Sequence, residues 1–198
     1  MNTDTEASET SHLRRKRLSP RRSAVIGVGV AITIAAIAVV SVLTGNNVTN
    51  GKISSTNELV GQRMKNFSLG GLNGGEIRAP WESGRASVIV FFGSYCGPCK
   101  AEMPKIAKYI RTNNPSPVEV LAMDATDERS SAQAMVKKDG VTFPVAFDPN
   151  AEVTNGIFGF IAVPESVFVN AKGVVTGVHI GAIPRSQLAG AIRLLRGS

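Results

Sequence analysis

Hydrophobic residues form one long uninterrupted run near the start of the chain, and afterwards only shorter runs separated by polar stretches. Residues 24–43, AVIGVGVAITIAAIAVVSVL, carry no charged side chain over 20 positions. A helix of that length spans about 30 Å, which matches the hydrocarbon thickness of a bilayer. A core helix in water would show a polar stripe, whereas only Thr33 and Ser41 interrupt this run. The pattern therefore predicts one transmembrane helix over residues 24–43.

The segments on either side of this run predict its orientation. Residues 1–23 contain six basic side chains, and no charge follows the run until Lys52. The positive-inside rule then makes 1–23 a basic cytoplasmic tail and sends the rest of the chain across the membrane. A cleaved signal peptide, cut at residues 36–38, is the alternative, but the long polar lead and the long span fit an uncleaved signal anchor better. Residues 44–58, rich in Asn, Ser, Thr and Gly, are expected to form a flexible linker.

The remaining residues, 59–198, alternate between short apolar runs and amphipathic stretches, as in one α/β domain. Two short strands around a glycine-rich turn, 66–69 and 76–78, predict an N-terminal β-hairpin extension. The elements expected after it are strand 87–92, helix 97–112, strand 118–123, helix 130–139, strand 143–147, strands 166–170 and 174–180, and helix 185–195. Alternation first and a hairpin last predict a central mixed β-sheet flanked by helices.

The net charge of +7 does not by itself indicate a nucleic-acid partner. The first 23 residues hold six basic and three acidic side chains, and the rest of the chain is only mildly positive. Residues 59–198 show no stripe of Lys and Arg interleaved with aromatic residues, so we expect no nucleic-acid binding.

The two cysteines of the chain, Cys96 and Cys99, lie between strand 87–92 and helix 97–112. In such sheets, chemistry takes place where a strand end faces a helix N-terminus. The unpaired N–H groups and the dipole of the helix lower the pKa of a thiol there, and Pro98 suits the first turn. We expect Cys96 to be the attacking sulfur and Cys99 the resolving one.

Two other interpretations of the cysteine pair are weaker. A zinc site would need two more ligands, and the histidines of the chain are His12, expected on the other side of the membrane, and His179. A purely structural disulfide would close too short a loop to restrain the unfolded chain much. We therefore predict redox chemistry with no metal and no cofactor beyond the cysteines.

Glu102 follows Cys99 by three residues and shares its helix face. Its carboxylate could take the proton from Cys99 during resolution, whereas a solvated surface glutamate is the alternative. Pro104 should kink this helix, or else the helix is shorter. Of the other chemical residues, His179 is expected to pack or face solvent, Trp81 to lie in the core or at its rim, and Asp124 to serve as a cap or turn.

Residues 91–104, FFGSYCGPCKAEMP, resemble the active-site segment of the thioredoxin superfamily. The CxxCKxEMP pattern is most similar to the extracytoplasmic TlpA/ResA/DsbE branch with its AhpC/TSA–Redoxin-like domain. Residues 140–144 and 148–150 are similar to the central insertion of that branch, and 163–165 resemble its cis-proline loop. The resemblance covers about residues 60–195 and implies a thioredoxin-like fold, with Glu102 as an active-site residue.

The same resemblance implies a substrate-binding surface. Pro164 would follow a cis bond and lie against the sulfurs, leaving the backbone of Val163 to pair with an extended substrate. Tyr95 replaces a common tryptophan and would offer an aromatic platform, while Gly97 and Pro98 form the thioredoxin dipeptide, which favours reduction. Cytoplasmic thioredoxins have a buried aspartate where this chain has Val90, so proton handling would fall to Glu102 or water.

These observations predict a single-pass cell-membrane protein whose catalytic domain faces outward and exchanges disulfides with exported proteins. The first hypothesis is a reductant, re-reduced by a membrane electron donor of the thiol-transfer type. By resemblance, its target would be apocytochrome c during cytochrome c maturation. An oxidant that introduces disulfides is one alternative, and a non-catalytic thioredoxin-fold binding module is another. The intact cysteine pair argues against the module.

Overall fold

The computed structural model describes residues 58–159 and 162–198. The predicted tail 1–23, transmembrane helix 24–43 and all of the linker except Glu58 lie outside these residues. None of the helices in the described part has the length and hydropathy needed to cross a membrane.

A five-stranded mixed sheet forms the centre of the domain, with the strand order β5-β4-β3-β6-β7. These strands are β3 (Ser87–Phe92), β4 (Glu119–Ala125), β5 (Val145–Asp148), β6 (Glu165–Val169) and β7 (Val175–Ile180). The first three run parallel, and β6 and β7 are antiparallel to their neighbours. Every residue of β3 is buried, as its β-branched and aromatic sequence requires of a central strand covered on both faces. The predicted mixed sheet is confirmed.

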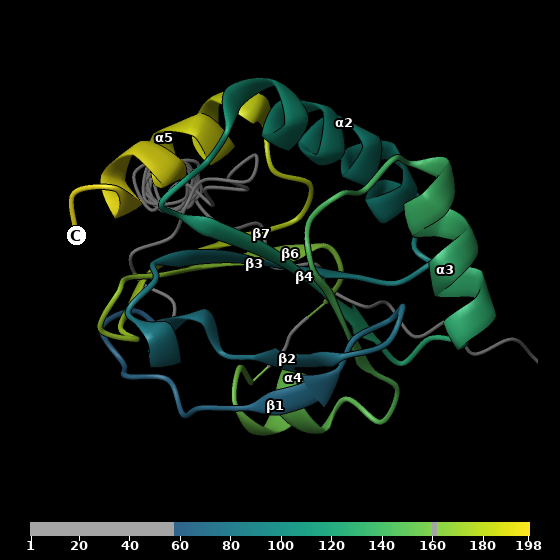
Figure 1. Cartoon of the computed structure of the whole chain (residues 1–198), viewed down its shortest axis with the longest axis horizontal. Helices are drawn as coiled ribbons and strands as arrows, with labels where there is room; N and C mark the ends of the chain where they lie inside the picture. The colour runs from purple at the N-terminus through teal and green to yellow at the C-terminus, as the bar shows by residue number, and fades with distance from the viewer. Residues whose placement is uncertain (1–57, 160–161) are drawn as a thin grey trace, which may run out of the picture. The chain divides into compact units, whose positions relative to one another are not determined.

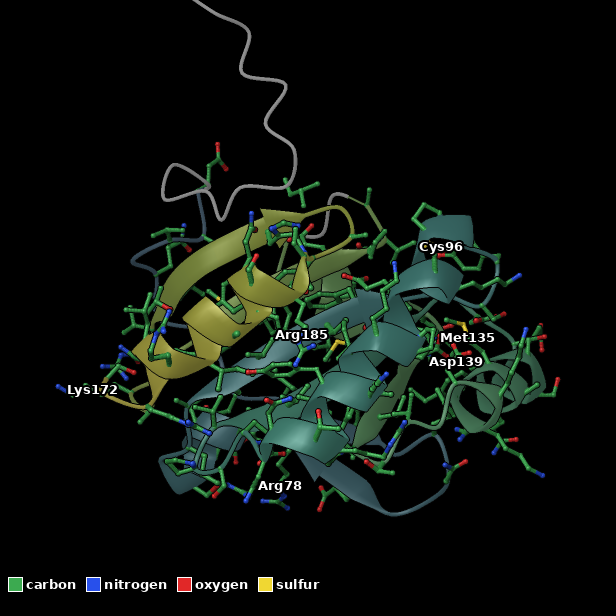
Figure 2. The ribbon with its side chains drawn as sticks, turned by 90° about the horizontal axis from the view of Figure 1, so that it is seen from above. Arg78, Cys96, Met135, Asp139, Lys172 and Arg185 are labelled. Atoms are coloured by element: carbon green, nitrogen blue, oxygen red, sulfur yellow. A yellow bond between two sulfur atoms is a disulfide. The ribbon has the colours of Figure 1, made fainter. Side chains whose placement is uncertain are left out.

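Helices α2 (Gly97–Asn113), α3 (Arg129–Lys138) and α5 (Arg185–Leu195) cover one side of the sheet (Figure 1). The side chains of β3 alternate between two apolar clusters because successive residues of a strand point to opposite faces. Val88, Val90 and Phe92 pack with the three helices. Figure 2 shows α2 beside α5, with Cys96 at the N-terminal end of α2.

The opposite face of β3 packs under the N-terminal hairpin. Ile89 and Phe91 join a cluster that includes Phe67, Trp81 and Phe158. Trp81 lies in the core, which is one of the two positions expected for it. The rings of Phe91 and Phe158 pack edge to face, with their centroids 5.0 Å apart. A short 3₁₀ turn, η1 (Pro80–Ser83), carries Trp81 into this layer.

The predicted β-hairpin extension is present as β1 (Ser68–Gly70) and β2 (Glu76–Arg78), paired antiparallel. Its turn requires glycine, because a Cβ on Gly71 would lie 2.3 Å from the carbonyl oxygen of Gly74. The hairpin is attached to the edge strand β5 through the Leu72 N–H, which donates to the Val145 carbonyl over 2.8 Å.

Two local features differ from the sequence-based expectations. Helix α4 (Glu152–Gly156) was not predicted, because its five residues are too few for a periodic signal. The helix is stabilised by Asp148, the last residue of β5, whose carboxylate accepts hydrogen bonds from the backbone N–H groups of Glu152 and Thr154. Helix α2 continues past Pro104 to Asn113, so the alternative of a shorter helix is wrong.

Candidate active site

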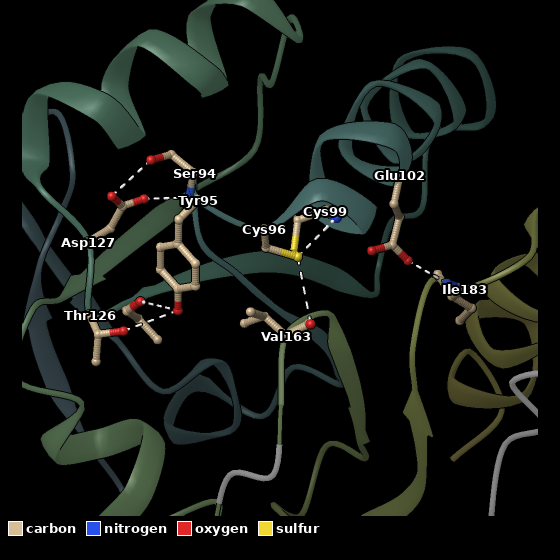
Figure 3. Close-up of a disulfide and its surroundings, with 10 residues drawn as sticks. Ser94, Tyr95, Cys96, Cys99, Glu102, Thr126, Asp127, Val163 and Ile183 are labelled. Carbon is tan, nitrogen blue, oxygen red and sulfur yellow. Dashed lines mark hydrogen bonds between the residues drawn. A yellow bond between two sulfur atoms is a disulfide. The ribbon is translucent and has the colours of Figure 1, made fainter.

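The two cysteines stand at the start of α2, directly after the loop that follows β3 (Figure 3). They are joined as a disulfide. Cys96 is the N-cap residue, and its sulfur accepts the backbone N–H of Cys99 over 3.1 Å. Cys96 keeps 7% of its surface exposed and Cys99 1%, so Cys96 is the sulfur that a partner can reach. In the reduced state, the same N–H and the helix dipole would favour a thiolate on Cys96.

The loop that contains Val163 and Pro164 faces the pair from the neighbouring strand. The peptide bond between these two residues is cis, as the resemblance implied. The carbonyl oxygen of Val163 lies 3.6 Å from the Cys96 sulfur (Figure 3). Pro164 is buried, and its own carbonyl accepts the Gly181 N–H over 2.8 Å, which ties the loop to the end of β7.

Glu102 is buried, so the alternative of a solvated surface glutamate is wrong. Only 4% of it is exposed, and its carboxylate accepts the backbone N–H of Ile183 from the loop before α5. Burial raises the pKa of Glu102 to about 7, against smaller lowering effects of the Ile183 N–H and of Lys105. A group with that pKa can both accept and return a proton near neutral pH.

A cavity of about 260 Å³ lies beside Glu102, between α2 and the start of α5. Ile106, Ile183 and Leu188 line its apolar part, while Lys105 and Arg185 supply positive charge. The apolar lining is the reason that the carboxyl group is poorly solvated.

Tyr95 is exposed over 58% of its surface beside the disulfide. Its hydroxyl lies 3.1 Å from the Thr126 hydroxyl and donates to the Ala125 carbonyl over 3.4 Å. One edge of the ring lies over Gly93, where an added Cβ would be 2.5 Å from the nearest ring atom. Tyr95 is therefore an exposed but anchored aromatic surface. Gly97 and Pro98, the first residues of α2, are also exposed.

Two acidic residues near the site were missed or wrongly interpreted from the sequence, whereas one of the two roles expected for His179 is confirmed. Asp127, in the loop after β4, accepts the backbone N–H and the hydroxyl of Ser94, and no sequence pattern indicated this pairing. Asp124 is fully buried within β4, so the predicted cap or turn role is wrong; β4 extends two residues beyond its expected end. His179 is fully buried and packs, as one of its two expected roles, with Nε2 3.2 Å from the Ala182 carbonyl.

Cysteine pairs in this position of a thioredoxin-like sheet carry out disulfide exchange, and the comparisons with known proteins agree with that chemistry. The protein is accordingly a thiol–disulfide oxidoreductase with a thioredoxin-like fold. The chain belongs to the Redoxin family, whose model matches residues 59–192. The resemblance to the TlpA/ResA/DsbE branch is confirmed. Such enzymes act on protein thiols and disulfides through their own cysteines and need no cofactor.

The relatives and structural neighbours are consistent with one another. The thiol-disulfide oxidoreductase ResA of Halalkalibacterium halodurans is 27% identical over 136 residues, which cover 69% of this chain and 77% of that protein. ResA of Bacillus subtilis is 26% identical, covering 69% and 75%. The structure of a DsbF homologue from Corynebacterium diphtheriae has a TM-score of 0.61 at 18% identity, covering 76% of this chain and 96% of that chain. A secreted Mycobacterium tuberculosis disulfide oxidoreductase has a TM-score of 0.58 at 23% identity, covering 65% and 96%.

Proposed function

We propose that the protein is an extracytoplasmic reductant of disulfides in exported proteins. The observation that carries this proposal is the Cys96-Gly97-Pro98-Cys99 pair at the start of α2, with buried Glu102 one turn further on. The sequence pattern of residues 1–58 supports a cytoplasmic tail, a retained membrane anchor over 24–43 and a linker, with residues 59–198 as the catalytic domain.

The carboxyl groups around the cysteine pair favour reduction over oxidation. A thiol–disulfide enzyme is strongly oxidising when its reduced form is stabilised, as happens when a thiolate is surrounded by positive charge. Here Glu102 lies one turn beyond the pair, and Asp127 bonds to Ser94, two residues before Cys96. Negative charge at these places counteracts the stabilisation of the Cys96 thiolate by the Cys99 N–H and the helix dipole, which makes the pair a better electron donor than those two groups alone would make it.

The reaction follows from the positions of the two sulfurs. The Cys96 thiolate attacks a substrate disulfide, forms a mixed disulfide and releases the first substrate thiolate, which takes up a proton. Cys99 gives its proton to the Glu102 carboxylate and attacks the Cys96 sulfur, which releases the second substrate sulfur as a thiolate that takes up the proton from Glu102. The substrate gains two electrons and two protons, and the enzyme is left with the Cys96–Cys99 disulfide. A membrane thiol-transfer protein returns it to the dithiol.

Substrate docking is assigned to the exposed groups around the disulfide. Tyr95, Gly97 and Pro98 offer an accessible surface on one side, and half-buried Val163, before the cis bond, offers its backbone on the other. The resemblance to the TlpA/ResA/DsbE branch supports the haem-binding cysteines of apocytochrome c as the target.

Two measurements test the proposal. A reduction potential near that of thioredoxin, about −270 mV, supports a reductant, whereas a value near about −120 mV would identify an oxidant instead. The Cys99→Ser variant should trap substrate on Cys96 as a mixed disulfide, and Cys96→Ser is the matched control that should trap none. Recovery of a c-type apocytochrome on Cys96 supports the target, and recovery of other exported proteins alone contradicts it.

A further inference from the structure

The turn that leads into Cys96 is held in place by a residue from the neighbouring strand's loop. Within this turn, the Cys96 N–H donates to the Gly93 carbonyl over 3.1 Å. Ser94, in the middle, donates both its backbone N–H and its hydroxyl to the two carboxylate oxygens of Asp127, the hydroxyl over 2.9 Å (Figure 3). Asp127 and Ser94 are both half-buried. The position of the turn therefore depends on the position of one carboxylate, 33 residues away in the chain.

Asp127 is supported in turn by a second carboxyl group. Asp124 lies opposite Phe92 in the β3–β4 pairing and is fully buried. Among the described residues, neither of its carboxylate oxygens has a hydrogen-bond partner. The Asp127 side chain is one of the acidic groups that act on it and raise its pKa. Two carboxyl groups can share a hydrogen bond only when one of them carries a proton. Asp124 is the more deeply buried of the two, so keeping it ionised costs more free energy than keeping Asp127 ionised.

Other charged groups around this pair also favour a proton on Asp124. Burial is the main cause that raises the pKa of Asp124, to about 8, and Asp127 and then Asp148 of β5 add negative charge. Arg129, in the first turn of α3, lowers the pKa, but its guanidinium is stacked on the ring of Phe147 at 4.1 Å. Near neutral pH the pair therefore consists of a neutral acid and a carboxylate.

We propose that Asp127 is a positioning residue for Cys96, and that Asp124, as a neutral acid, fixes Asp127 by donating a hydrogen bond to it. Asp127 accepts from Ser94, and Ser94 places the turn that presents the sulfur. Neither aspartate touches substrate. The proposal rests on the disulfide exchange at Cys96 that the proposed function assigns, and it holds for either direction of electron flow.

A dependence on pH follows from this arrangement. The rate at which Cys96 attacks a disulfide rises with pH as the thiol ionises. Above about pH 8, Asp124 loses its proton, and two carboxylates then face each other without a shared proton. Their repulsion displaces Asp127 from Ser94, so the rate should fall again at alkaline pH.

The test measures the rate constant of the full-length protein with oxidised glutathione from pH 5 to 10. All variants carry Cys99→Ser, so that only Cys96 reacts. Asp127→Ala should lower the rate about tenfold. Asp124→Asn, whose amide donates to Asp127 without titrating, should retain most of the rate at pH 7 and lose the alkaline decline. Asp124→Leu, which cannot donate, should resemble Asp127→Ala.

The controls separate positioning from folding. Asp139→Asn removes another carboxyl group of raised pKa, at the C-cap of α3, and should leave the pH profile unchanged. If Asp127→Ala does not fold, the proposal is still tested by comparing the pH profile of Asp124→Asn with that of the parent protein, which carries Cys99→Ser alone. The same alkaline decline in both, or no decline in the parent, overturns the proposal. Failure of the proposed function would show separately, as an oxidising potential of the wild-type cysteine pair.

Discussion

Glu102 shows how burial changes the chemistry of a single side chain. Its carboxylate lies in an apolar part of the cavity between α2 and α5, with the Ile183 N–H as its hydrogen-bond donor. Desolvation raises the pKa of this group to about 7, so it is half-ionised at neutral pH. This is the condition under which a carboxyl group exchanges protons with a thiol most effectively.

Replacing Glu102 by glutamine should slow the resolution of mixed disulfides. The amide can still accept the Ile183 N–H, but it cannot take the proton of Cys99. General-base contributions of this kind are typically about 100-fold or more. The lifetime of a mixed disulfide with a model peptide, followed by rapid quenching, measures the effect. A Gln variant that resolves as fast as the wild type would show that water, not Glu102, takes the proton.

The same substitution should change how stability depends on pH. The folded pKa of Glu102, about 7, lies above the reference value of 4.5, so the folded protein binds this proton more tightly. Stability is then lost as pH rises from about 4.5 to 7, by roughly 3 kcal/mol at most. Glu102→Gln lacks this loss, so its advantage in the free energy of unfolding should grow over that range and then level off. Urea unfolding of both proteins at pH 4.5, 6 and 8 measures it, and a constant difference contradicts the assignment.

Gly93 allows the ring of Tyr95 to lie against the backbone. A Cβ at this position would come within 2.5 Å of the ring, so Gly93→Ala should push the ring away and break its contact with Thr126. We expect a several-fold higher KM for a protein disulfide with little change in kcat, because a docking surface is lost and the sulfurs remain. Gly190→Ala in α5, where a Cβ meets only ordinary contacts, is the matched control. An unchanged KM would show that Tyr95 does not contribute to substrate docking.

At the scale of elements, the N-terminal hairpin connects the sheet edge to α3. Its Leu72 bonds to β5 through the backbone N–H, and the Leu72 carbonyl accepts from Arg129 over 2.7 Å and from Gln133 over 3.1 Å. The extension thus connects β5 with α3. These two elements lie beside the acidic residues Asp124, Asp127 and Asp148.

Gly71→Ala should disrupt this hairpin. The added methyl group would lie 2.3 Å from a backbone oxygen, so the turn has to move. We expect a loss of about 1–3 kcal/mol in the free energy of unfolding, as for other overpacked sites. Gly70→Ala, whose Cβ would meet nothing within 4 Å, is the control and should cost less than 1 kcal/mol. Equal losses in urea unfolding would show that crowding at Gly71 is not the cause.

At the scale of the whole molecule, residues 59–198 contain two apolar clusters, one on each face of the sheet, and the Redoxin family model matches residues 59–192. We therefore expect a fragment of residues 58–198 to fold and to retain disulfide exchange in vitro.

The full chain should fractionate with membranes, and its domain should be accessible to protease from outside the cell. A full chain found in the soluble fraction would contradict the predicted anchor over residues 24–43.

Much of the fold could be predicted because its elements have clear local periods. Strand β3 and helix α5 have the bounds expected from their patterns, and α2 ends one residue later than expected. The ends of the edge strand β5 were less predictable, since hydrogen bonds to residues far away in the chain determine them. The short helix α4 was not predicted either, since it is held by side-chain hydrogen bonds to Asp148 and not by a periodic pattern.

The sequence by itself determined the order of the strands and the longer helices, the cysteine pair at the start of a helix and the neighbouring Glu102, because patterns and spacing along the chain decide all three. Tertiary structure alone decided which acidic groups lose their water. Glu102 is buried by the loop before α5, and Asp124 by the strands on either side of it, so each acquires a raised pKa from residues far away in the chain. Desolvation depends on what packs around a group in space, and no local pattern contains that information.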